Sequence, residues 1–120
     1  MPHVVLGGRP GREALEAYAA RFEPFVFRDQ ELVVKVERLY REAAGRGVLL
    51  ETIVAARGHT QKFFIQLAPK EHELTVRLEP LTDPEKTVAV RRALALVAAQ
   101  VVAITGCAYA RGNIDEYLPR

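Results

Sequence analysis

The chain has 120 residues, 49% hydrophobic and 27% charged, and its 17 basic and 15 acidic side chains leave a net charge of only +2. This size and composition are typical of a globular domain and exclude an intrinsically disordered chain. No serine is present, which excludes serine-nucleophile mechanisms, and the single cysteine, Cys107, cannot form an internal disulfide. We therefore expect a cytoplasmic protein. Scarce asparagine and abundant Glu and Arg favour a thermophilic source, although a biased genome would have the same effect.

The N-terminal segment lacks the positively charged region and long apolar core of a signal peptide. We expect a single domain over residues 1–120, in which residues 1–10 are flexible or form a short edge strand. Residues 6–12 are rich in glycine but lack the spacing and the lysine–hydroxyl pair of phosphate-binding loops. We interpret them as a lead-in to the first helix.

Two helices are predicted next. Residues 12–22 follow Pro10 and carry their apolar side chains on one stripe, as an amphipathic helix does. Residues 29–45 fit a helix capped by Asp29 and ended by a glycine. Residues 25–36 also fit a β-hairpin, because β-branched and aromatic side chains favour strands. The sequence favours the helix, and the hairpin stays open as the alternative.

Three strands of a β-meander are predicted over residues 48–57, 61–68 and 72–79. The third strand alternates strictly between apolar and polar side chains, so one face of the sheet is covered and the other is wet. The middle strand leaves Phe64 on the polar face, between Lys62 and Gln66. An aromatic side chain in that position indicates a contact surface, unless the N-terminal helices shield it.

A long apolar helix is predicted over residues 83–105, capped by Thr82 or Asp83 and ended by Gly106, and residues 106–120 are expected to form a tail. Its uncharged stretch of thirteen residues is too short for a membrane span, which needs about twenty. Large apolar side chains form a seam along one side, and a stripe of alanines lies opposite. The stripe consists of Ala95, Ala99 and Ala103. Small residues would let another helix approach, either from the same chain or from a second copy.

These elements predict an α+β fold with the order α-α-β-β-β-α. We expect an antiparallel meander of three to four strands, with one sheet face covered by the long C-terminal helix. The apolar circumference of that helix requires more than one partner, so we expect a homodimer or larger homo-oligomer, with Ala95, Ala99 and Ala103 as the interface candidates.

No metal site, cofactor or catalytic group is expected from the sequence. Two of the three histidines, His59 and His72, lie at opposite ends of the middle strand, about 25 Å apart, and cannot share a metal ion within one chain. The lone Cys107 adds no zinc site of ordinary spacing.

The turn around residues 56–64 carries the binding candidates, which are Arg57, His59, Lys62 and Phe64. The order helix, three strands, helix over residues 29–105 resembles a double-stranded-RNA-binding domain, in which a turn histidine is followed four residues later by a strand phenylalanine, as His59 and Phe63 are. That resemblance implies RNA binding. Its second helix, however, should start with lysines, and here Asp83 and Glu85 would repel a phosphate backbone. The same order also resembles roadblock-type scaffold domains, which are dimeric and non-catalytic.

The sequence favours a non-catalytic module that works by self-association or by binding a protein partner, without contact to a membrane. One alternative is RNA binding through the basic turn at residues 57–62, although the basic residues are dispersed along the chain. Another is a small enzyme with its site at an oligomer interface.

Overall fold

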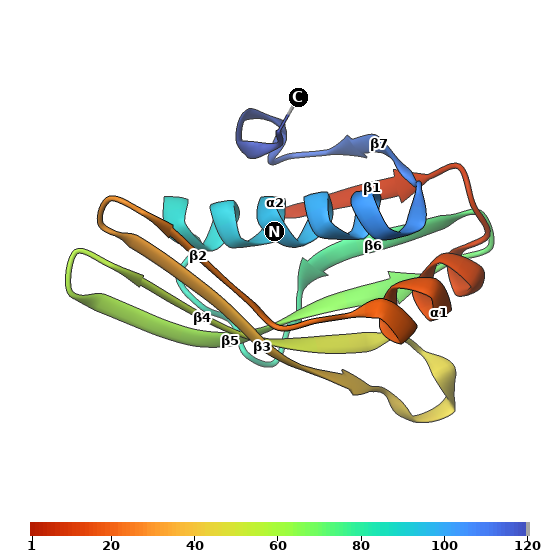
Figure 1. The fold of residues 1–120 in the computed structure, drawn as a ribbon, viewed down its shortest axis with the longest axis horizontal. Coiled ribbons are helices and arrows are strands. Elements are labelled where there is room, and N and C mark those ends of the chain that lie inside the picture. Colours follow the sequence, from red (N-terminus) through yellow and green to blue (C-terminus); the bar gives the residue numbers. More distant parts are fainter. Residues whose placement is uncertain (120) are drawn as a thin grey trace.

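The protein is built on one curled antiparallel sheet of seven strands that wraps around two helices (Figure 1). The computed structural model describes residues 1–119. Along the sheet the strand order is β2-β3-β4-β5-β6-β1-β7. The elements are β1 (His3–Gly7), α1 (Gly11–Arg21), β2 (Phe25–Asp29), β3 (Leu32–Arg41), η1 (Ala43–Gly45), β4 (Val48–Ala56), β5 (His59–Pro69), β6 (Glu73–Leu78), α2 (Val88–Thr105), β7 (Ala108–Gly112) and η2 (Asp115–Tyr117).

The core lies between α2 and the inner side of the sheet, which is the side on which both helices pack (Figure 1). Strand side chains alternate between the two sides, and those that face inward are almost completely buried. They include Val34, Val36, Leu50, Val54, Phe63, Ile65, Leu67, Leu74, Val76 and Leu78. By length and composition α2 could cross a membrane, yet half of it is buried inside the protein. It is the core helix of a globular body.

The expected three- to four-stranded meander with the order α-α-β-β-β-α is wrong. The three expected strands are present as β4, β5 and β6, but they belong to a sheet of seven. The segment expected as a second helix, residues 29–45, instead supplies the end of β2, the turn and β3. Both family resemblances rested on a helix in this position, so the order that carried them is absent from the structure.

The hairpin forms because the segment satisfies the period of a strand as well as that of a helix. Leu32, Val34 and Val36 are buried on the inner side, while Val33 and Lys35 face outward. The spacing of Leu32, Val33 and Val36 had also fitted a helix. Asp29 is not a helix cap; it pairs with Leu32 across a two-residue turn. β-branched side chains and a partner strand, β4, decide the outcome.

The two chain ends also differ from expectation, because both join the sheet. Residues 3–7, expected to be flexible or an edge strand, form β1 between β6 and β7. In the segment 106–120, expected to be a tail, β7 pairs with β1, and Ile114 and Leu118 are buried. Their partners lie far away in the sequence, so local pattern does not reveal the pairing.

The helix α2 begins at Val88, later than the predicted residue 83. Thr87 is its cap, and the Thr87 hydroxyl accepts a hydrogen bond from the Val90 N–H at 3.2 Å. The residues before it run beside β5, where the Glu79 N–H donates to the Phe64 carbonyl. At its other end Gly106 adopts a φ of 77°, and the predicted C-terminal cap is confirmed.

Candidate functional site

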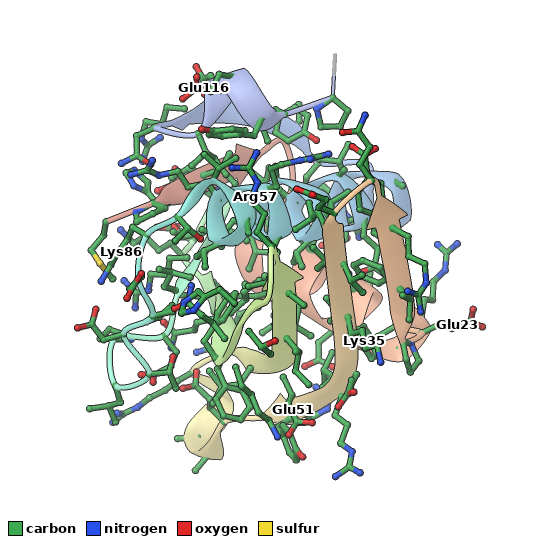
Figure 2. All side chains as sticks on the ribbon, turned by 90° about the vertical axis from the view of Figure 1, so that its left-hand side faces the viewer. Glu23, Lys35, Glu51, Arg57, Lys86 and Glu116 are labelled. Atoms are coloured by element: carbon green, nitrogen blue, oxygen red, sulfur yellow. The ribbon has the colours of Figure 1, made fainter. Side chains whose placement is uncertain are left out.

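A cavity of about 500 Å³ lies at the end of the curled sheet where α2 begins. Three segments meet there: the β2–β3 turn, the β4–β5 turn and the first residues of α2. Figure 2 views the molecule from this end, with Arg57 at the tip of the β4–β5 hairpin in front of α2. The lining residues are Asp29, Gln30, Glu31, Leu32, Val54, Ala56, Arg57, His59, Gln61, Thr87, Val88, Ala89 and Arg92.

The cavity exists because small side chains occupy inward-facing positions near the end of the sheet. Leu32 and Val54 are buried and form an apolar floor. Next to them Ala56 on β4 and Ala89 on α2 are too small to fill the space between strand and helix. Val88, at the mouth, is 56% exposed, which is unusual for a large apolar side chain. The floor and part of the rim are therefore apolar.

Two arginines at the rim are each paired with a carboxylate of the β2–β3 hairpin. Arg92 Nη2 lies 3.0 Å from Asp29 Oδ2, and the guanidinium also stacks on the Phe27 ring, 5.6 Å from its centroid. Arg57 Nε lies 3.1 Å from Glu31 Oε2. The second pair is 85% and 71% exposed, so it contributes little stability and is easily broken. Arg92 is the better-fixed guanidinium.

His59 and Gln61 lie on the inner side of β5, between the cavity and the segment that leads into α2. His59 Nε2 is 4.0 Å from Glu85 Oε2. The side-chain oxygen Oε1 of Gln61 accepts a hydrogen bond from the backbone N–H of Glu85 at 2.8 Å. The side-chain nitrogen Nε2 of Gln61 donates to the backbone carbonyl of Glu85 at 3.4 Å. These bonds hold the segment that leads into α2 against β5, beside one wall of the cavity.

The structure divides the four predicted binding residues between two surfaces. Arg57 and His59 lie at the cavity, whereas Lys62 and Phe64 lie on the outer side of the sheet. The two-residue period of β5 causes this division, because odd-numbered positions face inward along this strand. Asp29 and Arg92 were missed, since they come from segments that meet Arg57 only in the folded protein.

The outer side of β3, β4 and β5 carries apolar side chains among charged ones. Phe64 is half-buried and meets Tyr40 edge-on, with ring centroids 6.0 Å apart. On β4 the outward positions are occupied by Leu49, Glu51, Ile53 and Ala55, and three of these four are apolar. Glu51 projects from the side of the sheet opposite α2 (Figure 2).

The alanine stripe of α2 is not one continuous surface. Ala95 is 2% exposed and belongs to the core, Ala99 is half-buried, and Ala103 is exposed. Beside the stripe α1 of the same chain packs on α2, and the Tyr18 hydroxyl donates to Gln100 Oε1 at 2.5 Å. Part of the helix circumference is thus covered from within the chain.

Among residues 1–119, no three His, Cys, Asp or Glu side chains are grouped so that they could hold a metal ion. Cys107 is 3% exposed, and its backbone N–H donates to the Thr105 hydroxyl at 3.2 Å. Burial at the end of α2 keeps this thiol away from solvent.

Fold and cavity together define an α+β protein in which a curled antiparallel sheet encloses a core helix. No known family model matches the chain, and no curated protein or solved structure matches it significantly.

Proposed function

We propose that the protein is a non-catalytic cytoplasmic module that forms a homodimer through the outer side of β3, β4 and β5. The observation that carries the proposal is the composition of β4, which is apolar on both sides. Strands that read as nearly continuous apolar runs are typically covered on both faces. Both helices cover the inner side, and no helix of residues 1–119 covers the outer side of β4.

The size of this face suits a second copy. With the neighbouring β2 included, four strands about 4.8 Å apart and eight residues of about 3.3 Å each project to roughly 500 Å². Because the face is corrugated, its accessible surface is larger than its projection. The accessible surface therefore approaches the roughly 800 Å² that each partner buries in a standard interface. The exposed apolar side chains at its border, Val26 and Tyr40, extend the same surface over β2 and the end of β3.

Charges on this face suit self-association across a two-fold axis. Ile53 lies between Lys35 on β3 and Lys62 on β5, and Glu51 lies one outward position further along β4. Neither lysine forms an ion pair within residues 1–119. In an isologous interface, Glu51 of one copy can face a lysine of the other, because each patch meets its own rotated image.

The test is the oligomeric state of an Ile53→Glu variant in sedimentation at tens of micromolar. The wild type should sediment at twice the 13.4 kDa of the monomer. The variant should remain folded, because its new carboxylate has a lysine on each neighbouring strand, and it should sediment as a monomer. Ala103→Arg, on the exposed side of α2, is the matched control and should stay dimeric.

Three outcomes would overturn the proposal. One is a monomeric wild type at these concentrations. Another is dissociation by Ala103→Arg but not by Ile53→Glu, which would place the interface on α2. The third is a monomer that binds single-stranded RNA with steep salt dependence, because that result would assign the lysines and aromatic rings of the face to nucleic acid.

A further inference from the structure

We infer that the cavity at the start of α2 binds a small amphipathic monocarboxylate, a molecule with an apolar body and one carboxylate group. The inference is independent of the proposed dimer, whose interface lies on the opposite side of the sheet. It rests on the size of the cavity, its apolar floor, a fixed guanidinium at its rim and the charges of its lining.

Size and floor define the apolar body. A volume of about 500 Å³ falls within the range of small-molecule sites, which is roughly 300 to 1,000 Å³. Leu32, Val54, Ala56, Val88 and Ala89 provide aliphatic surface from two strands and a helix. Aliphatic surface on several sides favours a chain or ring of a few carbon atoms, because the transfer of each CH₂ group from water to such surface is favourable.

Arg92 defines the head group. Asp29 and Phe27 hold the guanidinium from two directions, and at 34% exposure it is the less exposed partner of its ion pair. Asp29 contacts only Nη2 of Arg92. The Nε and Nη1 atoms of Arg92 form no hydrogen bond within residues 1–119. A guanidinium carries five N–H donors in a planar fork that matches a carboxylate. The unused donors of Arg92 can therefore hold a ligand carboxylate without displacing Asp29.

The fixed charges of the lining disfavour a ligand that carries more than one charge. Its two guanidinium groups, Arg57 and Arg92, are paired with two carboxylates, Glu31 and Asp29. A dianion such as a phosphate monoester would meet these two carboxylates, and a cation would meet the two guanidinium groups. A monoanion that uses the remaining donors of Arg92 meets the least repulsion from this lining.

The experiment compares three probes with the same alkyl chain: octanoate, 1-octanol and octylamine. Binding is followed by two-dimensional amide NMR of the ¹⁵N-labelled protein. Octanoate should shift the amides of residues 29–32, 56–61 and 87–92 in a saturable way. It should bind at least about tenfold more tightly than octanol or octylamine, because only its carboxylate combines a negative charge with hydrogen bonds from the Arg92 guanidinium.

Two kinds of variant test the two halves of the site. Ala56→Leu places a larger side chain in the cavity and should abolish the octanoate shifts, whereas Ala103→Leu, on the exposed side of α2, should preserve them. Arg92→Met keeps the length of the side chain, removes its charge and should weaken octanoate binding about tenfold. If Arg92→Met fails to fold, Arg57→Met at the exposed hairpin tip replaces it, with a smaller loss expected.

The inference is overturned if octanol or octylamine binds as tightly as octanoate, or if none of the probes gives saturable shifts at millimolar concentration. Octanoate shifts confined to the outer side of β3, β4 and β5 would also overturn it. These outcomes leave the sedimentation result unaffected, so failure of one proposal can be told from failure of the other.

Discussion

Tyr18 is the largest fully buried side chain of the protein, and it joins the two helices. Its ring packs 5.9 Å from that of Phe22, and its hydroxyl donates to Gln100 on α2. Burial disfavours ionisation of a phenol, because the phenolate charge would lose its hydration. Burial therefore raises the pKa of Tyr18 well above its ordinary value.

The raised pKa predicts a loss of stability at high pH. Above about pH 10 the unfolded chain releases the Tyr18 proton while the folded protein keeps it, so the unfolded state binds fewer protons. The free energy of unfolding should then fall by about 1.4 kcal/mol per pH unit, from pH 10 towards the raised pKa. Below pH 10 this contribution is fully present.

The measurement is urea unfolding of the wild type and Tyr18→Phe between pH 8 and pH 11. The variant should be about 1 kcal/mol less stable at pH 8, because Gln100 loses a hydrogen bond, and the difference should shrink as the pH rises. Parallel stability curves over the whole range would show that Tyr18 does not carry the effect.

At the scale of elements, alternation along a strand decides which side chains are buried. On β6 the Val76 side chain is completely buried beneath the helices, whereas Thr75 faces the outer side next to Val5 of β1. A shift of one residue would exchange these two positions, so the pair reports directly on the register of the sheet.

We predict that Val76→Asp unfolds the protein and that Thr75→Asp does not. An unpaired carboxylate in the core costs several kcal/mol, whereas a substitution on the outer side costs far less. Far-UV circular dichroism and thermal unfolding of both variants measure the difference. Equal tolerance of the two changes would contradict the register.

The junction of α1 with the β5–β6 turn depends on a glycine. Gly11, the first residue of α1, donates its N–H to the Lys70 carbonyl, and a Cβ at this position would lie 2.0 Å from that oxygen. At Gly7 a Cβ would have its nearest contact at 3.8 Å, an ordinary distance. The backbone of α1 can approach the turn only where no side chain intervenes.

Gly11→Ala should therefore destabilise the protein by several kcal/mol, since backbone atoms would have to move. Gly7→Ala is the matched control and should change the free energy of unfolding by less than about 1 kcal/mol. Chemical denaturation of both variants provides the comparison. A stable Gly11→Ala variant would show that α1 can leave the turn without cost.

At the scale of the whole molecule, the curl of the sheet creates two unlike sides. The inner side is filled by α1 and α2, except at the cavity, and the outer side carries the apolar positions of β4. If the outer side is a dimer interface, folding and association are linked, because only folded chains can form the dimer.

The linkage predicts an unfolding temperature that rises with protein concentration. A tenfold increase in concentration should stabilise the dimer by about 1.4 kcal/mol, which corresponds to a shift of a few degrees. Differential scanning calorimetry over a hundredfold range of concentration measures it. Ile53→Glu should unfold at a temperature independent of concentration, and an equally independent wild type would contradict the dimer.

The local sequence pattern was sufficient to predict a helix or strand where one spacing of apolar residues runs through the whole element. The strands β4, β5 and β6 and the helix α2 were predicted because β-alternation or helical spacing runs through each of them, and the buried faces of Val76 and Leu94 follow from that spacing. Arg57 and His59 were found as site candidates because turn and charge occur together in one short segment. Composition excluded a serine nucleophile and an internal disulfide.

Only the tertiary structure decided the strand pairing and the assembly of the cavity, because both depend on residues that lie far apart along the chain. Residues 29–41 fit two periods, and pairing with β4 selected the strand. His3 pairs with Arg77, and Val5 with Arg111, across separations that no local pattern encodes. The cavity brings Asp29, Arg57 and Arg92 together from three segments, and the two-residue period of β5 places Lys62 on the other side of the sheet. A site of this kind is formed by the closure of the sheet around α2, so its residues become neighbours only when the chain has folded.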